Sequence, residues 1–167
     1  MTENVDFDRW LSAQQQRNWR AYLEGQAILW NGLNADLETF CDLSISEYEI
    51  LVRLSERENY TMRMSVLADE IAQSRSRVSH TVRRLEKRNL VMRKPALNDG
   101  RGVDCVMTEH GYSILQRSAP IHVASVRDRL VDVLTEEELS LLAVMFRRVA
   151  YAAGRDTSDS ENTFEVL

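Results

Sequence analysis

Apolar residues recur at helical spacing through most of the chain, and short polar segments separate the patterns. Between residues 8 and 40, six positions lie within about 40° of the direction of Trp19 on a helix of 100° per residue: Trp19, Leu23, Gln26, Trp30, Leu33 and Leu37. This pattern predicts one long helix with a largely apolar stripe.

A second helix is predicted to begin after Ser44. Ser44 and Glu47 have the spacing of a capping box, in which the hydroxyl accepts from a backbone N–H and the carboxylate accepts from the N–H of the cap residue. The helix should end near Glu56, where a polar segment follows. Its inward positions are Ile45, Tyr48, Leu51 and Val52.

Two shorter helices in tandem are predicted for the segment MSVLADEIAQSRSRVSHTVRRLE. Ser65 is expected to start the first helix, and Ser74 to cap the second after a tight turn. The separation of ten residues between Ala68 and Val78 is typical of the packing positions of a helix-turn-helix. The expected buried positions are Leu67, Ala68, Ile71, Val78, Val82 and Leu85.

The second helix of this pair presents a polar face to solvent. Short hydroxyl side chains near a helix start can reach base edges in a major groove, and Arg can bind guanine or phosphate. This composition predicts a recognition helix. The residues that point outward are Ser76, His80, Arg83 and Lys87, flanked by Arg77, Ser79 and Arg84.

Two apolar runs, at residues 90–94 and 103–107, enclose the turn-rich segment PALNDGRG and predict a β-hairpin. After a recognition helix, such a hairpin would be a wing. Arg101 is the only cation of its tip, and an exposed Arg on a narrow hairpin suits a minor groove. Asp99 could brace that guanidinium. The alternative is an ordinary surface turn that carries an Arg by chance.

Charge is distributed unevenly along the chain. Residues 75–101 hold nine Lys or Arg and two acids, a net charge of +7, whereas the whole chain has −5, so the remainder carries −12. A solvated helix face normally mixes both signs, and this segment does not. A basic patch on an acidic body indicates a polyanionic partner, and double-stranded DNA is the one we expect.

Further helices are predicted after the hairpin. Thr135 and Glu138 repeat the capping-box spacing, and Pro120 is expected to kink or restart the helix that contains it. Three amphipathic helices have more apolar surface than so small a lobe can cover, which predicts a dimer. The apolar positions that recur after the capping box are Leu139, Leu142, Phe146 and Val149.

With these motifs the chain resembles the winged helix-turn-helix transcription regulators of the multiple antibiotic resistance regulator (MarR) family. The resemblance is carried by SRSRVSHTVRRLEKRNLVMR, by NDGRG at the wing tip, by MTEHG and by APIHVASVRDRLVDVLTEEEL. It implies a mainly α fold with a small β-hairpin wing and an obligate homodimer. The implied division is an N-terminal dimerisation helix (1–40), a winged helix-turn-helix DNA-binding lobe (41–107), C-terminal dimerisation helices (108–153) and a flexible tail (154–167).

The resemblance also implies a function, namely sequence-specific repression of transcription by a homodimer on an inverted-repeat operator. The absence of a signal sequence and of long apolar runs predicts a cytoplasmic protein with no membrane partner. His80 departs from the Arg that many relatives carry at this position. The residues expected to contact DNA are Ser74, Arg75, Ser76, Arg77, Ser79, His80, Arg83, Arg84, Lys87, Arg93, Lys94, Asp99 and Arg101.

Members of this family are often released from DNA by a small molecule bound between the dimerisation helices and the DNA-binding lobe. Candidate residues for such an effector site are Trp19, Trp30, Tyr48 and His122, although aromatic residues at helical spacing are also ordinary core residues. Two alternatives stay open. One is a thiol-based redox regulator that uses Cys41 or Cys105, and the other is an adaptor whose winged helix binds protein.

Enzymatic chemistry finds no support in the sequence. No phosphate-binding loop and no nucleophile motif occurs, and His80, His110 and His122 lack paired ligand spacing with either Cys. We therefore expect no enzymatic activity, no cofactor and no metal site.

Overall fold

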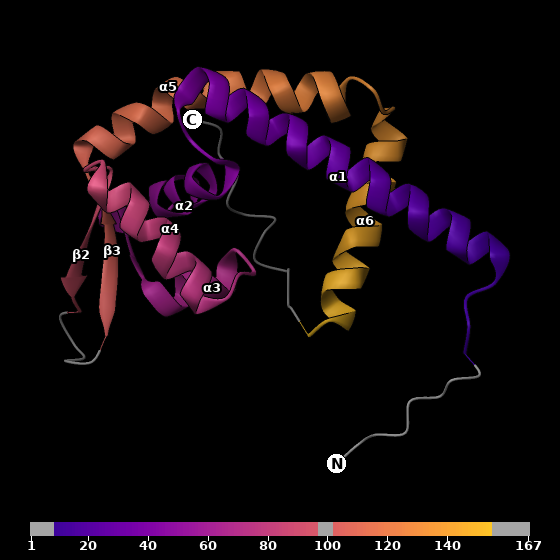
Figure 1. Ribbon diagram of the computed structural model, residues 1–167, viewed down its shortest axis with the longest axis horizontal. Coiled ribbons are helices and arrows are strands. Elements are labelled where there is room, and N and C mark those ends of the chain that lie inside the picture. Colours follow the sequence, from indigo (N-terminus) through magenta and orange to yellow (C-terminus); the bar gives the residue numbers. More distant parts are fainter. Residues whose placement is uncertain (1–8, 97–101, 155–167) are drawn as a thin grey trace, which may run out of the picture.

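The computed structural model describes residues 9–96 and 102–154, and helices dominate it (Figure 1). The helices are α1 (Ala13–Cys41), α2 (Ile45–Ser55), α3 (Met64–Glu70), α4 (Arg75–Lys87), α5 (Glu109–Val126), a π-helical turn (Arg127–Val131) and α6 (Glu136–Ala152). The strands β1 (Thr61–Arg63), β2 (Val91–Pro95) and β3 (Val103–Met107) form one antiparallel sheet in the order β1-β3-β2. The predicted class, mainly α with a small hairpin, is confirmed.

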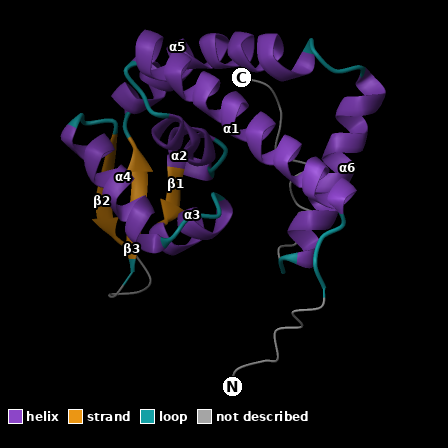
Figure 2. Ribbon diagram, turned by 45° about the vertical axis from the view of Figure 1, so that its right-hand side comes forward, coloured by secondary structure: helices purple, strands orange, loops and turns teal. Residues whose placement is uncertain are grey.

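The elements form a lobe and an extended helical scaffold. The sheet and helices α2, α3 and α4 make the lobe, while α1 and α5 run beside each other along its top (Figures 1 and 2). At the far end of α1, helix α6 lies against it, and the rings of Tyr22 and Phe146 have centroids 5.8 Å apart. Among the residues described, no helix combines the length and hydrophobicity needed to cross a membrane.

Capping residues fix where several helices begin. Ser44 and Thr135 form the predicted capping boxes with Glu47 and Glu138. Helix α1 begins at Ala13 rather than at residue 8, because Ser12 forms a third capping box: its hydroxyl accepts from the N–H of Gln15, and the Gln15 side chain accepts from the N–H of Ser12 at 2.8 Å.

The hydrophobic core lies inside the lobe and reaches α1 only at its C-terminal end. Leu33 and Leu37 are buried there against the lobe, whereas Trp19, Leu23 and Trp30, on the same predicted stripe, are exposed. All six positions expected to be buried in α3, the following turn and α4 are buried. Much of the remaining apolar surface of α1 is therefore left exposed within one chain.

The structure departs from the sequence-based expectations at three places. Ser65 lies within α3 and does not start it, because the helix begins directly after β1, with Arg63 as its N-cap. Strand β1 was not predicted, since its three residues are too few for an alternating pattern. Its pairing partner β3 is also distant in the sequence, with Met62 opposite Cys105, 43 residues further along the chain. Of the two outcomes expected at Pro120, a kink or a restart of the helix, the restart is excluded, because α5 continues past this residue.

The start of α5 lies so close to the backbone before β2 that the MTEHG motif needs a glycine, Gly111. A Cβ atom on Gly111 would collide with the carbonyl oxygen of Leu90, just before β2. Thr108 joins the same segments: its hydroxyl donates to the carbonyl of Asn89 at 2.7 Å and accepts from the N–H of Gly111 at 2.9 Å. The start of α5 is thus tied to the base of the hairpin.

Candidate nucleic-acid interface

Helix α4 is built as the second helix of a helix-turn-helix. Ala72, in the turn, has a left-handed φ of 53°, and the chain then enters α4 through Ser74, whose hydroxyl accepts from the N–H of Arg77 at 3.3 Å. Val78 and Val82 are fully buried on the inner side of the helix. This packing fixes which face of α4 turns to solvent.

That outer face consists of Ser76, His80, Arg83 and Lys87, which we call the recognition face, and all four are exposed as predicted. Ser74, Arg75 and Arg77 are also exposed at the start of the helix, and Ser79 is half-buried. The recognition face carries a hydroxyl and an imidazole toward the start of α4 and cations toward its end. Such a surface can contact both base edges and phosphates.

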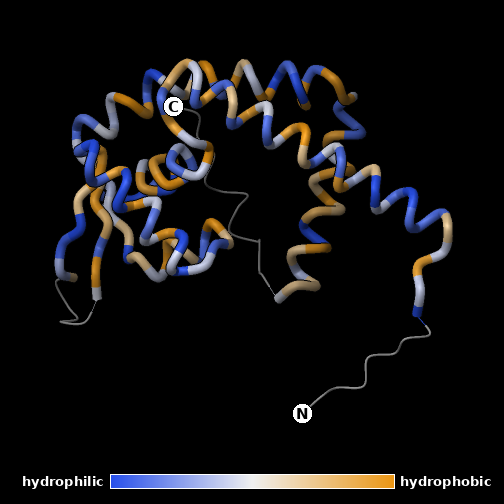
Figure 3. Tube along the Cα trace, viewed as in Figure 1, coloured by the Kyte–Doolittle hydropathy of each residue, from blue (hydrophilic) through white to orange (hydrophobic). Residues whose placement is uncertain are grey.

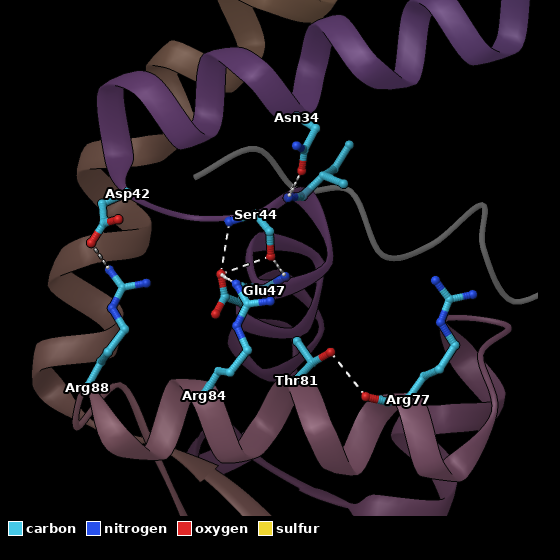
Figure 4. Close-up of polar contacts among 9 residues, drawn as sticks. Asn34, Asp42, Ser44, Glu47, Arg77, Thr81, Arg84 and Arg88 are labelled. Atoms are coloured by element: carbon cyan, nitrogen blue, oxygen red, sulfur yellow. Dashed lines mark hydrogen bonds and ion pairs between the residues drawn. The ribbon is translucent and has the colours of Figure 1, made fainter.

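Three neighbouring arginines contact carboxylates of the chain itself. Arg84 lies 3.1 Å from an oxygen of the buried Glu47, and Arg88 lies 3.1 Å from Asp42 (Figure 4). Arg93, on β2, pairs with Glu86 on α4 at 2.5 Å. Arg84 and Arg93 were expected at the DNA surface, and both are held by these contacts. No local sequence signal joins such partners, because Glu47 and Arg84 come from different helices.

The pair of Glu86 and Arg93 fastens the hairpin to α4. The carboxylate accepts from the backbone N–H of Arg93 at 3.0 Å and from its Nε at 2.9 Å. The hydrogen bond from the Arg93 side chain lowers the pKa of Glu86. Glu86 is the one acid within residues 74–94. Its contact with Arg93 explains why an acid occurs in so basic a segment. Lys94, next on β2, is exposed.

The expected tip of the wing lies outside the described residues. Asp99 and Arg101 belong to this gap, so the expected brace between them is not described. The strands on both sides of the gap pair in register, with Pro95 opposite Val103 and Arg93 opposite Cys105. The predicted hairpin is therefore confirmed up to the base of its tip.

The four candidate effector residues do not form one group. The rings of Tyr48 and His122 lie 4.5 Å apart between α2 and α5, but Trp19 stacks on Tyr22 and Trp30 is exposed on α1. Burial raises the pKa of Tyr48 to about 12 and lowers the pKa of His122. The Nδ1 atom of His122 is buried without a hydrogen-bond partner among the described residues.

A polar hollow of about 500 Å³ lies elsewhere, where the end of α1, the start of α2 and the end of α4 meet. Asp42, Glu47, Arg84 and Arg88 line it. None of the four aromatic candidates belongs to this hollow, whose lining carries charges of both signs.

The two cysteines do not resemble a redox pair. Cys105 is fully buried in β3, and burial raises the pKa of its thiol to about 12, which outweighs the opposite influence of Arg93. Cys41 is half-buried at the end of α1. Across the described part of the chain, no group of three or more His, Cys, Asp or Glu could hold a metal ion.

Comparison with known proteins matches this chain to transcription regulators. The family model described as MarR family matches residues 43–103. AbsC, a MarR family transcriptional regulator from Streptomyces coelicolor, is 43% identical with a TM-score of 0.82, covering 88% of this chain and 99% of AbsC. Sco3205, a MarR family regulator from the same organism crystallised in complex with DNA, is 37% identical with a TM-score of 0.84, covering 90% of this chain and 97% of Sco3205.

A curated relative extends this similarity to another organism. The HTH-type transcriptional regulator PecS of Dickeya dadantii is 27% identical over 146 residues, which are 80% of this chain and 88% of PecS. The matched region therefore includes the helical scaffold as well as the lobe.

Proposed function

This chain belongs to the MarR family of DNA-binding transcription regulators, which are not enzymes, and we propose that it represses transcription as a homodimer on an inverted-repeat operator. The recognition face of α4 enters the major groove in this proposal. One observation carries it: the recognition face is exposed on a helix whose opposite face is buried in the lobe.

The homodimer is supported by apolar side chains that one chain leaves in solvent. Helix α6 has no buried residue, and Leu141, Met145 and Val149 are 59%, 52% and 64% exposed. Figure 3 shows hydrophobic positions along α6 and along the part of α1 that lies beside it. Exposure of this extent on two adjacent helices is typical of an oligomer interface. We propose that α1 and α6 pack against the same helices of a second copy.

The domain division predicted from the sequence is part of this proposal. The segment 41–107 would bind DNA, and the segments 1–40 and 108–153 would form the dimer. Leu33 and Leu37 of α1 pack into the core of the lobe, so α1 serves both parts. We further propose that a small molecule releases the protein from DNA. Of the four candidate effector residues, Tyr48 and His122 lie together.

Selection of binding sites from a random duplex pool tests the proposed function. A twofold dimer presents its two recognition helices about one helical turn apart, so we expect enrichment of an inverted repeat with half-sites roughly 10–10.5 bp apart. Recovery of sequences without any repeat, or of no preferred sequence, would contradict the proposal.

A further inference from the structure

We propose that Glu47 is a positioning residue for DNA recognition, whose buried carboxylate holds Arg84 and so fixes α4 against α2. Arg84 would then orient the recognition face and would not serve as a primary phosphate contact. The inference rests on the proposed role of α4, and it assigns a task to an acid that lies outside the DNA surface.

The contacts of Glu47 show how firmly it is held. Its side chain is 2% exposed, and its Oε2 atom accepts from the backbone N–H and from the hydroxyl of Ser44, both at 2.9 Å. The same oxygen lies 3.1 Å from a guanidinium nitrogen of Arg84. A buried carboxylate that lost its cation would keep an uncompensated charge, which is strongly destabilising. Glu47 and Arg84 therefore constrain each other.

Arg84 is suited to this task by its place on α4. Its side chain is 52% exposed on the flank of the helix, so it reaches from the solvent edge to the buried carboxylate. One turn later, Arg88 contacts Asp42 in the same way, but Asp42 is 95% exposed, and such surface pairs contribute little. The contact with Glu47 is thus the stronger of the two restraints on this flank (Figure 4).

The restraint continues from α2 into the scaffold. The side-chain oxygen of Asn34, on α1, accepts from the backbone N–H of Ile45 at 2.9 Å, in the first turn of α2. Ser44, between these groups, is held by Glu47. The chain of contacts runs from the recognition helix through Glu47 to the helix that we assign to the dimer. It therefore relates the direction of α4 to the dimer scaffold.

The consequence for DNA reading follows from helix geometry. Ser76 precedes Arg84 by eight residues, a distance of about 12 Å along the helix axis at 1.5 Å per residue. A rotation of α4 by about 5° around Arg84 would move Ser76 by ~1 Å, which is enough to break a hydrogen bond to a base edge. Loss of the restraint should therefore affect sequence preference more than the attraction to phosphates.

The experiment uses Glu47→Gln, which keeps the shape of the side chain and an acceptor for the capping box but removes the charge. Affinities for the selected operator and for a random duplex are measured at several salt concentrations. We expect the operator-over-random ratio to fall at least fivefold. We also expect the salt slope on random DNA to steepen, by up to about 0.9 for each new phosphate contact of the freed Arg84. The matched control is Glu56→Gln, which removes the same charge from a local ion pair with Arg53 at the C-terminal end of α2 and should change neither quantity.

A second variant separates the alternatives. If Arg84 were a phosphate contact, Arg84→Met would flatten the salt slope and Glu47→Gln would leave the ratio unchanged, and these results would overturn the proposal. If Arg84→Met folds poorly, the double variant Glu47→Gln/Arg84→Met should regain melting temperature, because no unpaired charge stays buried. A double variant no more stable than Arg84→Met would also count against the proposal.

Arg83→Ala tests whether α4 binds DNA at all. If this variant changes the affinity for neither duplex, the proposed function is wrong, and the result says nothing against the positioning role of Glu47.

Discussion

At the scale of single residues, the cations near the recognition helix differ in what they already contact. Arg84 and Arg93 are paired with carboxylates of the same chain, whereas Arg83 and Lys87 are exposed on the recognition face. A paired guanidinium must exchange a carboxylate for a phosphate, but an exposed cation gains the phosphate without such a loss. Arg83 and Lys87 should therefore contribute most to phosphate binding.

Replacement of Arg83 or Lys87 by Ala should weaken binding to operator and to random DNA alike. Each lost phosphate contact should flatten the salt slope by about 0.9, because fewer counterions are released. Replacement of Ser76 or His80 by Ala should instead weaken operator binding alone. Fluorescence anisotropy on both duplexes across a salt series gives the four results, and identical behaviour of all four variants would refute the proposed division of labour.

The cysteines provide a prediction for the folded protein alone. With a pKa of about 12 and full burial, the Cys105 thiol should resist iodoacetamide at pH 8, because almost none of it is thiolate. Intact mass should show at most one adduct in the native protein, on Cys41, and two adducts in denaturant. Rapid native labelling of Cys105 would contradict this prediction and would reopen a redox role.

At the scale of elements, one ion pair fastens the wing to the recognition helix. Glu86 of α4 accepts from both the backbone and the side chain of Arg93, which restrains strand β2 against the recognition helix. The hairpin and the helix should therefore act as one unit when they bind DNA. This link also makes the stability of the unit depend on pH.

Glu86→Gln should lower the free energy of unfolding by about 1 kcal/mol at neutral pH. The pKa of Glu86 is lowered in the folded state, so its contribution is present above the unfolded pKa near 4.5 and is lost as pH falls through the folded pKa. The difference in melting temperature between this variant and the parent should accordingly be largest at neutral pH and shrink in acid. A difference independent of pH would mean that the charge of Glu86 is not what stabilises the hairpin.

The sequence predicts those elements whose signals are local. The capping boxes at Ser44 and Thr135, the cap at Ser74 and the inward valines of α4 are each determined by residues within a few positions of one another. Strand β1 was missed because its partner is distant. The pair of Glu47 and Arg84 was missed for the same reason. The recognition face could be predicted from periodicity, but which of its neighbouring arginines are already paired could not.

At the scale of the whole molecule, the scaffold joins the lobe to surfaces that one chain leaves uncovered. Asp36 on α1 accepts from Ser125 at 2.7 Å and pairs with Arg129 at 2.7 Å, which ties α1 to the π-helical turn between α5 and α6. The direction of α6 is thereby related to that of α1. A dimer formed through these helices would set the distance between its two recognition helices.

A charge on the apolar face of α6 should disrupt this dimer. Val149→Glu is expected to give a monomer in light scattering with an unchanged helical signal, because Val149 is exposed within one chain and its replacement breaks no internal contact. Val66→Glu, at an exposed valine of α3, is the control and should remain a dimer. A parent protein that is itself monomeric would disprove the proposed assembly.

Protection of guanine N7 atoms from dimethyl sulfate tests the account most directly. N7 lies in the major groove, so an inserted α4 should shield it. On the selected operator we predict two protected clusters, centred about one helical turn apart on one face of the duplex, and a higher protein concentration needed for the same protection with Arg83→Ala. Bound DNA whose guanines stay reactive, or a single protected cluster, would contradict a dimer that reads DNA through α4.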